Sequence, residues 1–165
     1  MDIIPDPDPP DALSAFSGLF DLATRMGLTV TWVSPRALAN IKACRHCGGH
    51  HDGQAWGMTN IAHRNIDLDS DMGPWMATRV LAHELGHVVG PNPNYMPDQV
   101  AEYVAETAAR LVAFDHFACP DPDVRTESDD YITSMADALS PDTAELARVA
   151  GTVAGRAIIQ GLNGS

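Results

Sequence analysis

Two histidines and a glutamate stand at a spacing that suits a catalytic metal site. In the segment VLAHELGHVVG, residues 80–90, His83 and His87 are four positions apart and Glu84 follows the first of them. On a helix this spacing places both imidazoles on one face, where they can bind one zinc ion. Glu84 would project beside that ion, and its carboxylate can accept a proton from the attacking water. The segment therefore predicts a zinc site with its own catalytic base.

A catalytic zinc needs a third protein ligand, and the following segment offers two carboxylates. Glu102 and Glu106 are again four positions apart in AEYVAETAARLV, so they share one face of an expected helix. If the chain reverses through residues 91–97, that helix lies against the HELGH helix. Glu106 is the preferred ligand and Glu102 the alternative. The other carboxylate would hold a ligand imidazole by its second nitrogen, or remain a solvated surface charge.

Hydrophobic periodicity and helix-breaking residues predict the elements that position these side chains. The fold class that fits them is α+β, with a small mixed or antiparallel sheet beside the active-site helix and the remaining helices packed around it. A Pro- and Asp-rich arm over residues 1–11 is expected to precede a single domain over 12–165. The expected elements are helices at 11–26, 74–90, 97–114, 129–139 and 142–160, a strand at 28–33, a hairpin at 57–69, and loops at 43–56 and 118–130.

The order of these elements resembles the ImmA/IrrE family of zincin-like metallopeptidases: GLTVTWV precedes a hairpin ending in NIDLD, and VLAHELGHVVG precedes a glutamate-bearing helix. VAETAARLV is also similar to the glutamate helix of the metallopeptidase domain in ArdC-type antirestriction proteins. The resemblance covers about residues 12–115 and is most specific at the HExxH segment. It implies a gluzincin-like zinc site and a protein substrate, such as a regulatory protein of a phage or mobile element.

A second, structural zinc is an open alternative for the cysteines. Cys44 and Cys47 form C-x-x-C, and His116 and Cys119 have the same spacing, so together they make a Cys₃His set. His46, His50 and His51 are rival ligands in the loop that holds the first pair. The competing interpretation is three reduced thiols without metal, since the odd number of cysteines argues against a disulfide framework.

The net charge and the hydropathy of the sequence argue against two classes of partner, nucleic acids and membranes. The formal net charge is −12, and Lys42 is the only lysine. Such a surface repels phosphate backbones and anionic lipid heads, which disfavours direct binding to nucleic acid. No stretch is long and apolar enough for a bilayer, and the N-terminal segment lacks the pattern of a signal peptide. A cytoplasmic protein without a membrane partner is expected.

Two functions fit this pattern. The first is a zinc metallopeptidase that hydrolyses peptide bonds of a protein substrate. The second is a catalytically weak, zinc-containing binding module that engages a regulator or a host defence protein. Glu84 favours the enzyme, because a purely structural site gains nothing from a carboxylate beside its metal.

A peptidase also requires contacts to its substrate. The strand NIDLD, residues 65–69, is a candidate for binding the substrate backbone by strand addition. A hydrogen-bond donor for the oxyanion is expected as well. Its candidates are Tyr95, Tyr103, Tyr131 and His63.

Overall fold

The computed structural model of the protein describes residues 11–34 and 56–164. Within them lie five α-helices and a mixed three-stranded sheet, which confirms the expected α+β character. No helix in these ranges combines the length and apolar character needed to cross a bilayer. The elements are α1 (Ala12–Arg25), β1 (Thr29–Val33), β2 (Gly57–Asn60), β3 (Asn65–Asp69), α3 (Pro74–Val89), the 3₁₀-helix η1 (Pro93–Tyr95), α4 (Asp98–Arg110), the π-helix η2 (Leu111–His116), α5 (Pro122–Asp137) and α6 (Pro141–Asn163).

The sheet has the order β1-β3-β2, with β3 parallel to β1 and antiparallel to β2. The expected hairpin is confirmed, and Arg64, with a φ of 54°, lies in the turn between β2 and β3. Because β3 is the central strand, both of its edges are hydrogen-bonded to neighbours. The prediction that residues 65–69 receive a substrate strand is therefore wrong; the edge strands are β1 and β2.

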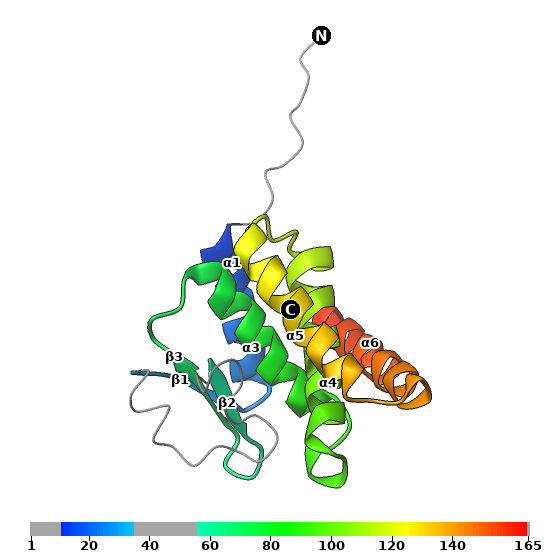
Figure 1. Ribbon diagram of the computed structural model, residues 1–165. Helices are drawn as coiled ribbons and strands as arrows, with labels where there is room; N and C mark the ends of the chain where they lie inside the picture. The colour runs from blue at the N-terminus through cyan, green and yellow to red at the C-terminus, as the bar shows by residue number, and fades with distance from the viewer. Residues whose placement is uncertain (1–10, 35–55, 165) are drawn as a thin grey trace.

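Helix α3 carries the HELGH segment between the sheet and helices α4, α5 and α6, as Figure 1 shows. It begins at Pro74, whose fixed φ suits the first helical position. Helix α4 packs closely on α3 because Gly86 has no side chain there. A Cβ atom at Gly86 would lie 3.0 Å from Cα of Ala105. The close contact of the two helix backbones brings the glutamates of α4 to the histidines of α3.

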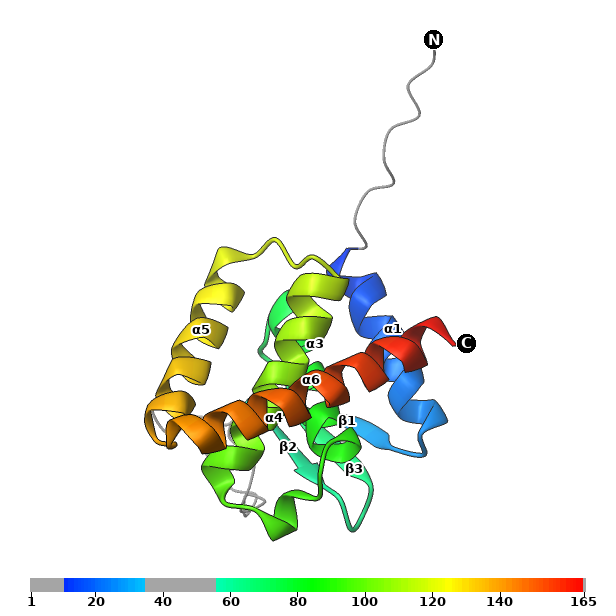
Figure 2. The same ribbon diagram turned by 90° about the vertical axis from the view of Figure 1, so that its right-hand side faces the viewer.

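Helix α6 lies across α4 and also contacts α3 (Figure 2). The crossing depends on Gly151, where a Cβ atom would come within 2.5 Å of Cβ of Thr107 and 2.7 Å of the carbonyl oxygen of Val104. Leu19, Leu81, Ala108 and Ile158 are fully or almost fully buried in the shared core, so α1, α3, α4 and α6 are packed together through one apolar cluster.

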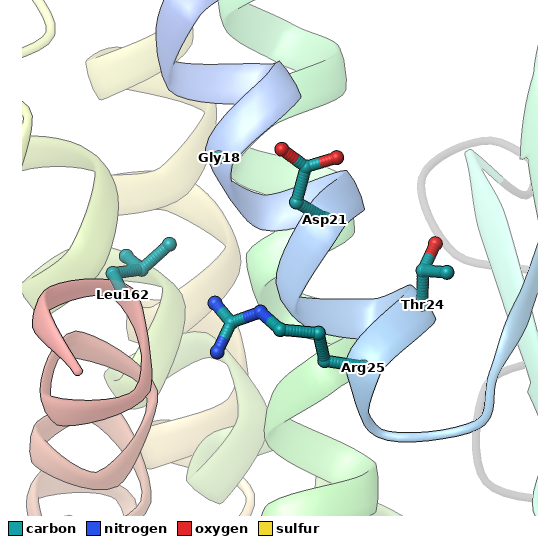
Figure 3. A pocket seen from close by; sticks show the side chains of 5 residues that line it. All are labelled: Gly18, Asp21, Thr24, Arg25 and Leu162. Carbon is teal, nitrogen blue, oxygen red and sulfur yellow. The ribbon is translucent and has the colours of Figure 1, made fainter. Parts of the chain in front are cut away.

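We expect Gly151→Ala to lower the free energy of unfolding by about 1–3 kcal/mol, because backbone and side-chain atoms of α4 must move to admit one methyl group. The matched control is Gly18→Ala, which changes another helical glycine. Gly18 lines a surface pocket of about 370 Å³ between α1 and the end of α6 (Figure 3). An added Cβ there meets only the side chain of Leu162 at 3.6 Å. Gly18→Ala should therefore stabilise the protein, by up to about 1 kcal/mol, through helix propensity. Denaturant unfolding measures both values, and equal shifts would contradict the steric argument.

Two expected boundaries are wrong. The helix expected over 97–114 is α-helical only to Arg110 and continues as the π-helix η2. The loop expected over 118–130 is mostly helix, because α5 begins at Pro122 and not at residue 129. Asp121 caps α5 by accepting hydrogen bonds from the backbone N–H groups of Asp123 and Val124, which explains the early start.

Candidate metal centre

His83 and His87 of α3 and Glu102 of α4 form a buried group that could hold a metal ion. One ligand atom from each residue lies within 4.8 Å of the others. The exposed fractions of the three residues are 8%, 3% and 1%, respectively. We call these three residues the metal centre. Two imidazoles and one carboxylate are the donor set of a zinc site that keeps a further position for water or substrate.

The contacts of His87 indicate whether the metal centre is suited to bind a cation. Nε2 of His87 is buried and makes no hydrogen bond within residues 11–34 and 56–164. It lies 3.4 Å from Oε1 of Glu102, within ion-pair range. A buried polar atom without a hydrogen bond is costly unless something else satisfies it. A cation between the imidazole and the carboxylate would do so.

His83 is held between the two glutamates of α4. Its Nε2 lies 2.9 Å from Oε2 of Glu102, and its Nδ1 lies 2.9 Å from Oε1 of Glu106. Glu102, the alternative third ligand of the sequence analysis, is thus the carboxylate grouped with both histidines. Glu106, the preferred ligand, lies on the other side of the His83 ring. It occupies the place of a carboxylate that orients a ligand histidine by its second nitrogen.

Glu106 is committed to further partners. Its two oxygens accept hydrogen bonds from Nε and Nη2 of Arg79 at 2.9 and 3.1 Å, and Oε2 also accepts one from the hydroxyl of Ser128 at 2.7 Å. Burial disfavours the carboxylate, but the charge of Arg79 and the hydrogen bond with His83 outweigh it and hold the pKa of Glu106 at about 2. Glu106 is therefore a fixed anion behind His83.

The metal centre favours positive charge. Burial disfavours the imidazolium form of His83, but hydrogen bonds to Glu102 and Glu106 raise its pKa to about 10. Two carboxylates around one imidazole create a negative potential that a divalent cation would also satisfy.

Glu84 directly follows His83 on α3 and is not a member of the metal centre. The residue is buried, with an exposed fraction of 3%, and its Oε2 accepts a hydrogen bond of 2.5 Å from the hydroxyl of Thr59 on β2. Gly57, at the start of β2, leaves room for this carboxylate, because a Cβ atom there would lie 3.1 Å from Oε1 of Glu84. The sheet thus fixes the residue expected to act as base.

Of the four candidate oxyanion donors, the structure brings one to the metal centre. Tyr131 of α5 donates a hydrogen bond of 2.5 Å to Oε2 of Glu102, and its ring lies edge-on to His83 with centroids 5.7 Å apart. Burial and the nearby carboxylates raise the pKa of Tyr131, so its hydroxyl keeps its proton. Tyr95 is 88% exposed, His63 is exposed in the β2–β3 turn, and Tyr103 lines a separate pocket between α4, α5 and α6.

The second zinc stays a prediction. Cys44 and Cys47 lie outside the described residues, as do His46, His50 and His51. Among residues that the structure does describe, His116 and Cys119 belong to no group of metal-ligating side chains. Cys119 packs in a small apolar cluster with Ala113, Phe114 and Val124, and burial raises the pKa of its thiol.

Three residues around the metal centre were missed at the sequence level: Thr59, Arg79 and Ser128. Only Arg79 had a usable signal, since it stands four residues before His83 and so lies on the same face of α3. The other two come from β2 and α5, whose placement depends on the tertiary fold.

The surface pocket between α1 and α6 is a separate feature, because no member of the metal centre lines it (Figure 3).

Comparison of the chain with protein-family models, with curated proteins and with solved structures finds no match.

Proposed function

We propose that this protein is a zinc-dependent metallopeptidase of the zincin type. The observation that carries the proposal is the position of Glu84, which directly follows His83 on α3, is buried, and is not among the grouped residues. A closed structural zinc site has four protein ligands and no use for an extra carboxylate. Three ligands with an adjacent carboxylate suit hydrolysis.

In this proposal each residue has a separate task. A bound zinc ion would polarise the scissile carbonyl and acidify the attacking water. His83, His87 and Glu102 would hold the ion, while Glu106 keeps the ring of His83 oriented through its Nδ1. Glu84 would accept the proton of the water and pass it to the leaving amine. The hydroxyl of Thr59 would keep the Glu84 carboxylate in place.

The edge strand β2 is the candidate surface for the substrate backbone. It is hydrogen-bonded to β3 along one edge, and within the described residues no strand pairs with the other. Gly57 and Thr59 both contact Glu84, so a peptide added to β2 would pass close to the base. A protein substrate in extended conformation fits this arrangement. The resemblance to the ImmA/IrrE family supports a regulatory protein as that substrate.

The proposal is tested by zinc content and peptide cleavage. Elemental analysis should find zinc in the purified protein, and His83→Ala should contain one zinc fewer per chain. His63→Ala is the matched control, because it removes an exposed histidine and should leave zinc unchanged. The wild-type protein should cleave a mixed-sequence fluorogenic peptide library, and His83→Ala should not.

Two results would count against the enzyme. Equal zinc content in wild type and His83→Ala would show that HELGH holds no metal. Zinc that is lost in His83→Ala, together with a wild type that cleaves no member of the library, would favour the binding module instead.

A further inference from the structure

Helix α5 contacts Glu102 and Glu106, the two glutamates of α4 that lie around His83. The hydroxyl of Tyr131 donates to Glu102 at 2.5 Å, and the hydroxyl of Ser128 donates to Glu106 at 2.7 Å. Tyr131 and Ser128 are three positions apart, so they lie one above the other on one face of α5. Their acceptors are four positions apart on α4. Each hydroxyl thus meets its own carboxylate.

These two residues make up most of the buried face of α5. The buried residues of this helix are Val124, Ser128 and Tyr131, with exposed fractions of 3%, 0% and 3%. Val124 packs in the apolar cluster with Phe114 and Cys119, and several further contacts of α5 are polar. Arg110 of α4 pairs with Asp129 at 2.7 Å and donates to Ser128 at 3.0 Å, and Arg79 of α3 lies 3.5 Å from Glu127. An amphipathic helix normally packs through an apolar stripe, whereas two of the three buried residues of α5 donate hydrogen bonds to Glu102 and Glu106.

The effect of such hydrogen bonds is to fix a carboxylate before a cation arrives. A glutamate side chain has several rotamers, and a donor on one oxygen selects the rotamer that aims at the site. Ser128 also links Arg110 to Glu106, because its hydroxyl accepts a hydrogen bond from Arg110 and donates one to Glu106. The two carboxylates around His83 are thus oriented from α5.

We infer that α5 supports the metal centre. Its residues Tyr131 and Ser128 are positioning residues that set the affinity for a divalent cation through Glu102 and Glu106. The inference rests on the proposed function for the identity of the ligands. It goes beyond that function because α5 lies outside residues 12–115, the range that resembles known metallopeptidases.

The test compares metal affinity in variants that leave the ligands intact. Tyr131→Phe removes one hydroxyl and keeps the ring against His83. Competition with a chromophoric chelator should show zinc binding weakened about 10- to 100-fold. The visible absorption spectrum of the Co²⁺-loaded protein should change as well, because the geometry of the Glu102 ligand changes. Ser128→Ala provides a second variant, with a smaller decrease expected, since Glu106 keeps Arg79 and His83.

Ile132→Ala is the control. Ile132 is next to Tyr131 on α5 but lines the pocket that also contains Tyr103 and Thr107. This substitution should leave the zinc affinity and the Co²⁺ spectrum as in wild type. Wild-type affinity and spectrum in both Tyr131→Phe and Ser128→Ala would overturn the inference while leaving the metal centre standing. If wild type itself binds neither Zn²⁺ nor Co²⁺, the proposed function and this inference both fail.

Discussion

Glu84→Gln is expected to retain the zinc of the wild-type protein and to cleave peptides about 10²- to 10⁴-fold more slowly. Glutamine has the shape of glutamate and can still accept the hydrogen bond of Thr59, but it accepts no proton near neutral pH. Because Glu84 is not grouped with His83, His87 and Glu102, the metal should remain bound. Hydrolysis of the fluorogenic peptide library and elemental analysis on the same sample measure the two properties together.

Thr59→Val is the companion variant for this prediction. It replaces the hydroxyl that donates to Glu84 by a methyl group of similar size. The zinc content should again stay unchanged, and the rate of cleavage should fall by less than in Glu84→Gln, because the base is present but less well positioned. Wild-type rates in Glu84→Gln would refute its role as base. Loss of zinc from Glu84→Gln would instead indicate that Glu84 is a metal ligand.

The HELGH histidines were predictable because their relation is local. Helical geometry alone sets His83 and His87 one turn apart, and Pro74 and Gly90 delimit the helix. The same argument applies to Glu102 and Glu106 as a pair. Local geometry could not decide which of the two is grouped with the histidines, because a shift of α4 by one turn exchanges them.

The packing of two antiparallel helices decides between the glutamates. Along α3 the order is Arg79, His83, His87, and across from them α4 presents Glu106 and then Glu102. Arg79 pairs with Glu106, which leaves Glu102 for His87. The short connection through residues 91–97 already implied antiparallel helices. Arg79, four residues before His83, was the sequence signal that could have assigned the later glutamate to a supporting role.

The sheet and α5 show two other limits of sequence reasoning. The alternation in residues 65–69 correctly indicated a strand, but it carries no information on whether that strand is central or at an edge. In α5, the polar sequence around Thr126 and Asp130 suggested a loop. The local signal for a helix was the pair Asp121 and Pro122, a capping residue followed by proline at the first helical position. Ser128 lies in the middle of the buried face of α5, between Val124 and Tyr131, so it interrupts the hydrophobic periodicity that would have revealed the helix.

The second prediction of large effect separates the two glutamates by paired substitutions. Glu102→Gln should lose most of its zinc and keep its fold, because it weakens a ligand while preserving shape and hydrogen-bonding capacity. Glu106→Gln should keep stoichiometric zinc at saturating metal, with affinity reduced about 10- to 100-fold through the looser orientation of His83. Chelator competition measures both affinities, and circular dichroism at equal protein concentration reports the fold.

The free energy of unfolding should change in the opposite order: Glu106→Gln should lower it more than Glu102→Gln. Glu106→Gln leaves the buried guanidinium of Arg79 without its main counter-charge, and breaking a buried pair from one side costs about 3–5 kcal/mol. Glu127, 3.5 Å from Nη1 of Arg79 and only partly buried, offsets part of that loss. Glu102→Gln leaves the pair of Arg79 and Glu106 intact, so metal-free protein with this change should lose less stability than Glu106→Gln. Zinc lost from a folded Glu106→Gln but retained in Glu102→Gln would make Glu106 the ligand after all. Because each substitution is expected to affect mainly one property, either zinc binding or stability, measuring both assigns each carboxylate its role.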